Sequence, residues 1–285
     1  MKKYILMAGV VLLAACSKDQ PLVDETAVEQ TSSKQLEIVI DGEVNTLNFI
    51  ETNGELTLVE DEAYAKVNTV LNSQNLITVI NSEVDKMLFF SGEQELQQFD
   101  ENPQQLAVLS EKFGVLKEAV PSATPKSSTL KFRIARAHSL GGPAYTVNAS
   151  SGRYFNRHLL RNQCITGGID FDNEISSFRV YQGGTVEFHE DPDYLGKRIR
   201  VQAVTQDVYV ADLADLKKKS FTIYDGSFDP YYICNRWALC LTSFNDKITS
   251  ITAARNGLSL DYRRINLCSG GGGGGDGSDD PTNHY

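Results

Sequence analysis

Two six-residue segments of the sequence share one arrangement of oxygen-bearing side chains. The first, DNEISS, covers residues 172–177, and the second, NDKITS, covers residues 245–250. Each has two Asp or Asn residues, two variable residues, then a Ser or Thr followed by a Ser. Calcium takes about six to eight hard oxygen ligands in a flexible geometry, whereas magnesium demands a tighter octahedral shell and keeps its water. Both segments are therefore candidate calcium sites.

The same pattern has an explanation that needs no metal ion. Asp, Asn and Ser favour Asx turns, and such a turn can precede a strand without any ligand. For a single copy this explanation is the stronger one. Two copies in one register, each after a hairpin signal, favour the metal, because turn propensity alone does not account for the shared register.

The first residues of the chain have the pattern of an export signal. Lys2 and Lys3 precede an apolar run over residues 4–15, which is too short to span a membrane. The stretch LAAC that ends at Cys16 resembles a bacterial lipobox, in which the cysteine is acylated and the peptide before it is removed. We expect a lipid anchor at Cys16 and a place in the bacterial cell envelope, at the outer membrane. An ordinary cleaved signal with an accidental cysteine is the alternative.

Charge and cysteine content limit the remaining possibilities. Without Lys2 and Lys3 the chain has 25 basic and 37 acidic residues, which argues against a nucleic-acid partner. The other cysteines form an even set in an exported protein, so two disulfides with three possible pairings are expected. A zinc site is the alternative, but no CxxC or HxxxH spacing accompanies them, and without a GxSxG or HExxH motif we expect no enzyme. The four are Cys164, Cys234, Cys240 and Cys268.

Two predicted domains lie between a polar tether over residues 16–34 and a glycine-rich tail over residues 269–285. Residues 35–125 predict a small α+β domain, with a hairpin around Asp41-Gly42 and a helix that carries Val67 and Val70 on one face. Residues 126–268 contain short alternating runs separated by turn signals, which is typical of a β-sandwich or barrel.

Within the second domain, side chains of matching type surround two predicted hairpins. Phe188, Tyr194 and Gly196 lie around the second hairpin, where glycine permits a positive φ and an aromatic ring can cover the turn. The corresponding places of the first hairpin are occupied by Ile134, Leu140 and Gly142. Each hairpin is followed by one of the six-residue segments.

This order, occurring twice, resembles a βγ-crystallin domain, a pair of Greek-key motifs packed as a two-sheet sandwich. The resemblance covers about 125 of the 285 residues. It implies a mainly β fold, with a C-terminal βγ-crystallin-like sandwich preceded by the small α+β domain.

The resemblance also implies two bound Ca²⁺ ions, with the six-residue segments side by side and each lending a ligand to the other's ion. Side chains would supply some ligands and backbone carbonyls beside Glu174, Lys247 and Glu190 the others, while Ser177 and Ser250 tie each hairpin to the loop. The implied set is Asp172, Asn173, Glu174, Ser176, Asn245, Asp246, Lys247, Thr249 and Glu190.

These expectations describe a lipid-anchored envelope protein whose calcium-binding domain has a structural or interaction role. Its partners would be the membrane, through the anchor, and a protein or glycan at the envelope. The alternative is an inhibitor of secreted peptidases that presents a disulfide-held loop around Trp237, between Cys234 and Cys240. That alternative rests on analogy of fold.

The lipobox pattern makes the first testable prediction. Cys16→Ser removes the thiol that would be acylated, so the protein should leave the detergent phase in phase separation while its melting temperature stays unchanged. An unchanged detergent partition of the Cys16→Ser protein would contradict the lipid anchor.

Overall fold

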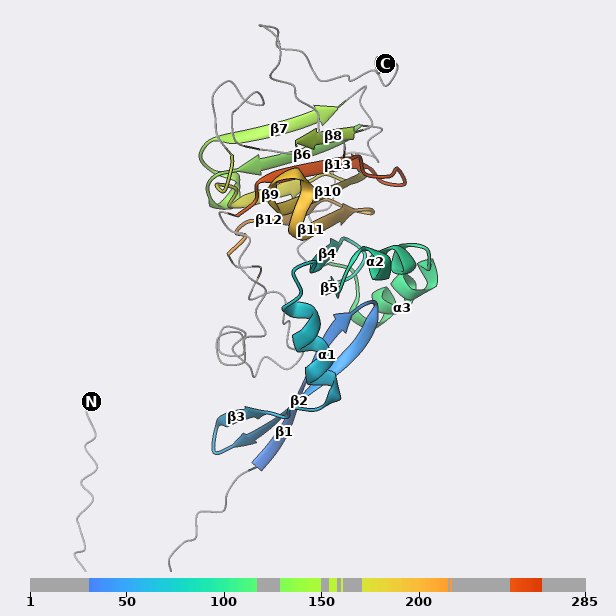
Figure 1. Cartoon of the computed structure of the whole chain (residues 1–285), viewed down its shortest axis with the longest axis vertical. Helices are drawn as coiled ribbons and strands as arrows, with labels where there is room; N and C mark the ends of the chain where they lie inside the picture. Colours follow the sequence, from blue (N-terminus) through green and yellow to red (C-terminus); the bar gives the residue numbers. More distant parts are fainter. Residues whose placement is uncertain are drawn as a thin grey trace, which may run out of the picture.

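The computed structural model describes residues 31–116, 129–149, 154–157, 160, 171–214, 216 and 247–262. These residues form one nine-stranded sheet, one four-stranded sheet, and helices that pack on the first part of the large sheet (Figure 1). The fold is mainly β. None of the helices in the described part of the chain is long and apolar enough to cross a membrane.

The first part of the chain builds five strands and three helices. A hairpin joins the first two strands through Asp41 and Gly42, which have φ of 50° and 78°, the left-handed pair that a tight hairpin turn requires. The elements are β1 (Thr31–Ile40), β2 (Glu43–Thr52), β3 (Glu55–Leu58), α1 (Glu62–Leu71), β4 (Ile77–Asn81), β5 (Met87–Phe90), α2 (Glu93–Asp100) and α3 (Pro103–Phe113).

Strand β5 is buried on both faces because helices cover both sides of this part of the sheet. Met87 and Phe89 point into a core that includes Val67 of α1. Leu88 and Phe90 point into a second core with residues of α2 and α3. The sequence MLFF is accordingly apolar throughout, as expected for a strand with no solvent-facing side.

The second part of the chain forms two facing four-stranded layers. Its elements are β6 (Leu130–Ala135), η1 (His138–Leu140), β7 (Ala144–Ala149), β8 (Tyr154–Arg157), β9 (Ser177–Val180), β10 (Gly184–Asp191), η2 (Pro192–Tyr194), β11 (Leu195–Ala203), β12 (Val208–Val210) and β13 (Ser250–Arg255). One layer has the strand order β12-β9-β6-β7, and the other has the order β11-β10-β13-β8. The rings of Phe178 and Phe188 stack between the layers with centroids 4.6 Å apart.

The two layers exchange one strand each. Strands β6, β7 and β9 of the first half share a sheet with β12 of the second half, which pairs with β9. Strands β10, β11 and β13 of the second half share a sheet with β8 of the first, which pairs with β13. Each half therefore completes the sheet of the other, and neither sheet can form from one half alone.

A parallel pairing joins the two parts of the molecule into the nine-stranded sheet. Strand β4 runs beside β11, with Ile77 opposite Arg198 and Asn81 opposite Gln202. Just beyond the strand, the buried Ser82 hydroxyl accepts hydrogen bonds from the N–H groups of Val204 and Thr205, at 2.9 and 3.1 Å. The predicted α+β domain is thus continuous with the predicted β domain through one sheet.

Both hairpins of the second part fold back in the same way. Ser139, Leu140 and Gly142 have positive φ of 55°, 59° and 66° in the first hairpin. In the second, Asp193, Tyr194 and Gly196 have 58°, 64° and 74°. A side chain at Gly196 would also collide with the Asp191 carboxylate, so glycine is needed there on two counts.

One serine hydroxyl fastens each hairpin. Ser250 Oγ accepts from Tyr194 N–H at 3.1 Å and donates to Asp191 O at 2.8 Å. Ser177 Oγ accepts from Leu140 N–H at 3.0 Å and donates to Ala137 O at 2.5 Å. The structural role predicted for both serines is confirmed. The first hairpin keeps its shape without an aromatic residue because the Ser177 hydroxyl binds two of its backbone groups.

These bonds make the second prediction. Ser177→Ala leaves the part-buried Leu140 N–H without its acceptor, and Ser250→Ala does the same to the buried Tyr194 N–H. Each change should lower the free energy of unfolding by about 1–3 kcal/mol in urea denaturation. The exposed Ser259 makes a suitable control, and Ser259→Ala should change stability by less than about 0.5 kcal/mol. Equal stability of all three variants would show that the two hydroxyls do not secure the hairpins.

Candidate metal centre

The first six-residue segment lies beside residues 247–250, the described part of the second segment. In the first segment Asn173 is exposed, with a left-handed φ of 57°, and Asp172 is half-buried. Asn173 N–H donates to the carbonyl of Ile248 in the second segment at 3.0 Å. This cross-link brings the two segments within reach of each other's oxygen atoms, as a shared arrangement of ligands requires.

The fifth residue of each segment has the same surroundings. Ser176 and Thr249 are 7 % and 8 % exposed. Ser176 N–H donates to Ala135 O at 3.0 Å, and Thr249 N–H donates to His189 O at 2.9 Å. The backbones of both residues are thus held against the end of the strand that enters the folded hairpin.

The carbonyls of the same two residues are also equivalent. Leu213 N–H donates to Ser176 O at 2.8 Å, and Leu160 N–H donates to Thr249 O at 2.8 Å. Leu160 follows β8 and Leu213 follows β12, which are the two exchanged strands. The strand exchange therefore also helps to position the two segments. These backbone carbonyls are occupied, which leaves the hydroxyls as the groups of Ser176 and Thr249 that can turn toward an ion.

One hydroxyl and one carbonyl of the predicted ligand set lie together. Thr249 Oγ1 donates to Glu190 O at 3.0 Å. If both oxygens bound one ion at about 2.4 Å, they would subtend about 77° at the ion, close to the equatorial spacing of about 72° in a pentagonal bipyramid. The pair therefore fits a shared calcium ion, provided that the hydroxyl proton turns away from the carbonyl.

The third residue of each segment uses its side chain elsewhere. Glu174 forms an ion pair with Arg136, and Lys247 Nζ lies 3.4 Å from Glu190 Oε1. The two ion pairs occupy equivalent places, but their charges are exchanged. The first segment supplies the acidic residue of its pair, and the second segment supplies the basic residue. Only the backbone carbonyls of Glu174 and Lys247 are then left for an ion, as the resemblance implied.

The described part of the chain contains no group of three or more His, Cys, Asp or Glu side chains placed to hold a metal. A site here would depend on hydroxyl and carbonyl oxygens with few charges, which is typical of weaker calcium modules. Asn245 and Asp246 of the second segment lie outside the described residues. So do the lipobox cysteine and the four predicted disulfide cysteines, Cys16, Cys164, Cys234, Cys240 and Cys268.

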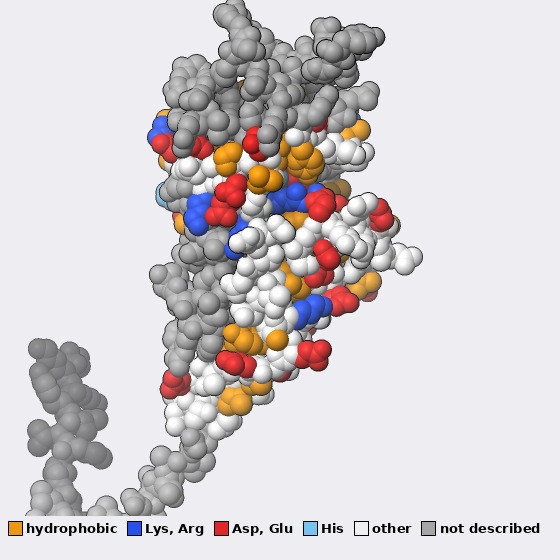
Figure 2. All heavy atoms as spheres, in the orientation of Figure 1, with side chains coloured by type: hydrophobic (Ala, Val, Ile, Leu, Met, Phe, Trp, Pro, Cys, Tyr) orange, Lys and Arg blue, Asp and Glu red, His pale blue; other side chains and the backbone are white. Residues whose placement is uncertain are grey.

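A buried charge cluster that no sequence pattern indicated lies where the two parts of the molecule meet. Glu187 of β10 is fully buried and accepts from Arg200 Nε at 2.6 Å. Arg200 Nη1 donates to Asp100 of α2 at 2.8 Å. Arg198 contacts Glu93 of the same helix, and basic and acidic side chains gather around this junction in Figure 2. Arg200 thus links a strand of the sandwich to a helix of the first part.

Burial and charge pairing shift the pKa values of the cluster. Burial disfavours ionisation of Glu187, but contact with His189 and the charge of Arg200 outweigh it, and the Glu187 pKa lies below its ordinary value. Burial raises the Asp100 pKa against the opposing effect of Arg200. Burial lowers the pKa of Arg198 to about 10, so both arginines stay charged at neutral pH.

Comparisons with known proteins can be set beside this geometry. No protein-family model matches the chain, and no curated protein matches it. Among solved structures, it is similar to spherulin 3a of Physarum polycephalum, at 15% identity over 50% of this chain and 96% of that one, with a TM-score of 0.26. It is also similar to a βγ-crystallin domain of Flavobacterium johnsoniae, at 17% identity over 45% of this chain and 98% of that one, with a TM-score of 0.23.

A third similar structure comes from a study of the evolution of the eye-lens βγ-crystallin fold, at 15% identity, 47% and 94% coverage and a TM-score of 0.27. Within the present chain, two four-strand units exchange one strand and repeat the same hairpin and serine bonds. The domain is βγ-crystallin-like. The first five strands of the chain add to one sheet of the sandwich.

The charge cluster makes the third prediction. The lowered Glu187 pKa stabilises the fold above the unfolded-state pKa, and this contribution is lost as pH falls below about 4.5 through the folded-state value. Glu187→Gln removes the titrating group and leaves Arg200 undercompensated, so it should cost about 3 kcal/mol at pH 7. Its unfolding free energy should then depend less on pH between about 5 and 3 than that of the native protein.

Glu95→Gln on α2 is the matched control, because Glu95 lies outside the cluster, and it should keep the native pH dependence. Urea denaturation at several pH values provides the measurement. Parallel curves for the native protein and Glu187→Gln would mean that Glu187 does not contribute to the acid sensitivity of the fold.

Proposed function

We propose that the chain is a lipid-anchored protein of the bacterial cell envelope whose βγ-crystallin-like domain binds two calcium ions. Calcium would stabilise the sandwich and hold it in the shape that an envelope partner contacts. The pairing of Thr249 Oγ1 with Glu190 O is the observation that carries the calcium proposal, because a hydroxyl and a carbonyl of the expected types lie 3.0 Å apart.

The duplication supports a second site. Ser176 makes the same two backbone hydrogen bonds as Thr249, through its N–H and its carbonyl, and the residue is equally buried. The bond from Asn173 N–H to Ile248 O joins the segments, so loss of one ion should weaken the other site. The implied side-chain ligands Asp172, Asn173, Asn245 and Asp246, and the backbone carbonyls of Glu174 and Lys247, complete this proposal.

The peptidase-inhibitor alternative has no such support. The loop around Trp237 that it requires lies outside the described residues. No described feature favours inhibition over a structural or interaction role, and the inhibitor remains an analogy of fold.

The fourth prediction separates the hydroxyl from the shape of its side chain. Thr249→Val keeps the branching but removes Oγ1, whereas Thr249→Ser keeps the hydroxyl. The native domain and Thr249→Ser should bind two ions with dissociation constants of about 10⁻⁵ to 10⁻³ M, while Thr249→Val should lose one site and bind the other more weakly. Calorimetric titration gives the stoichiometry. At one hundred times the dissociation constant each site should add about 2.7 kcal/mol of stability.

Glu174→Ala is a control for the first segment, because it removes a surface ion pair with Arg136 but no backbone carbonyl. It should change stability by less than about 1 kcal/mol and leave two ions bound. If the native protein binds no calcium at about 1 mM, or if Thr249→Val still binds two ions, the repeated segments are turns without a metal.

A further inference from the structure

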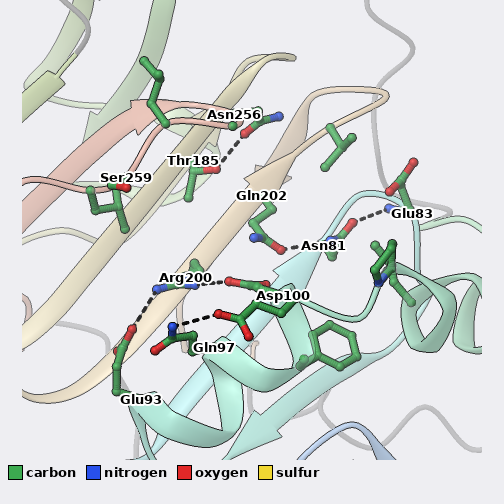
Figure 3. Close-up of a pocket in the computed structure, with 18 of the residues that line it drawn as sticks. Asn81, Glu83, Glu93, Gln97, Asp100, Thr185, Arg200, Gln202, Asn256 and Ser259 are labelled. Carbon is green, nitrogen blue, oxygen red and sulfur yellow. Dashed lines mark hydrogen bonds and ion pairs between the residues drawn. The ribbon is translucent and has the colours of Figure 1, made fainter.

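A cavity of about 690 Å³ opens at the junction between the two parts of the molecule. Helix α2 and the end of β4 form one wall, and β11, the start of β10 and the chain after β13 form the other (Figure 3). The volume lies within the range of about 300–1,000 Å³ that is usual for small-molecule sites. The cavity is separate from the six-residue segments and uses none of their residues.

The floor of the cavity carries buried hydrogen-bond donors that are held in place. Asn81 is 2 % exposed, donates to Gln202 Oε1 at 2.9 Å and accepts from Glu83 N–H at 2.8 Å. Arg200 is 7 % exposed and fixed by Glu187 and Asp100 through Nε and Nη1. Its Nη2 lies 3.7 Å from Glu93 Oε1, beyond hydrogen-bond reach, so this group can still donate.

The rim of the cavity carries acceptors and an oriented ring. Among the side chains that line the cavity, four are carboxylates and one is an arginine. Tyr262 is 40 % exposed, and its hydroxyl donates to Glu187 Oε2 at 2.9 Å, which fixes the direction of the ring. The ring also packs edge-to-face on Tyr194, with centroids 5.7 Å apart. The four carboxylates belong to Glu83, Glu93, Asp100 and Glu101.

This distribution of charge and hydrogen-bond groups selects among ligand classes. An anion would meet four carboxylates at the rim. A simple amine would meet the Arg200 guanidinium on the floor and leave the amide donors unused. A hydroxyl group both donates and accepts, so a ligand with several hydroxyls can accept from the floor and donate to the rim. Its C–H faces can lie against the Tyr262 ring and the apolar side chain of Leu258.

We propose that this cavity binds a neutral saccharide. The proposal gives a ligand class to the interaction role proposed above and in that respect rests on it, but it requires no calcium. Arg200 and Asn81 would donate to sugar oxygens, and Gln97 and the rim carboxylates would accept from sugar hydroxyls. Because the walls come from both parts of the molecule, neither part would bind the saccharide alone.

The test uses the full mature chain with Cys16→Ser to keep it in solution. Binding of cellotriose, maltotriose and N-acetylated chitotriose is measured by calorimetry, with trigalacturonate and spermidine as the acidic and basic comparisons. Each titration is run with calcium and with a chelator. At least one neutral trisaccharide should bind with a dissociation constant of about 1 mM or lower in both conditions.

Two neighbouring glutamines on α2 make a matched pair of variants. Gln97 lines the cavity, and its side chain donates to the exposed Glu101, whereas Gln98 is exposed and is not part of the lining. Gln97→Ala should weaken binding about three- to tenfold, and Gln98→Ala should leave it unchanged. Ser259→Trp places a large side chain at the opening and should abolish binding while the melting temperature stays native.

Three results would overturn the proposal. They are no binding of any neutral trisaccharide at about 10 mM, binding of only trigalacturonate or spermidine, and binding that survives both Gln97→Ala and Ser259→Trp. The calcium-dependent melting shift, measured on the same samples, tests the calcium proposal separately. A native shift without saccharide binding would refute only the saccharide site, and binding without a shift would refute only the calcium sites.

Discussion

The parallel pairing of β4 with β11 decides which side chains of the two parts of the molecule can meet. It sets Ile77 opposite Arg198 and Asn81 opposite Gln202, so α2, which packs beside β5, faces the outward side chains of β11. The reach of Arg200 from Glu187 to Asp100 follows from this register. A shift of β4 by one residue would turn its side chains to the opposite faces of the sheet, and Asn81 would no longer lie on the face that carries Arg200 and Gln202.

The local features of the fold could be predicted from the sequence, because local chemistry determines them. The turn at Asp41-Gly42, helix α1 with its buried Val67 and Val70, and the positive φ of Gly196 all follow from residue type and spacing. The predicted equivalence of Leu140 with Tyr194 is confirmed by matching φ values and serine bonds. The segment DNEISS also forms the turn that its Asp and Asn residues favour.

The junction could not be predicted in the same way, because it depends on contacts between distant residues. The apolar run ITVIN indicates a buried strand, but nothing within it identifies β11 as its neighbour, more than 100 residues away. Arg198 and Arg200 alternate with apolar residues, which is also typical of an exposed strand face. Their burial depends on α2, which covers them. The sequence around Glu187 likewise gives no sign that this residue is buried, because its partner Arg200 lies on another strand.

The same pairing also protects the molecule from unwanted assembly. In the layer β11-β10-β13-β8, strand β11 would otherwise be an edge with unpaired N–H and C=O groups, and its core-facing residues Ile199 and Val201 are fully buried. Edges of this kind act as templates for another chain. Strand β4 pairs with β11 and so covers that edge. A sandwich without the first part of the chain would expose β11 as an unpaired edge strand, to which another copy of the sandwich could pair.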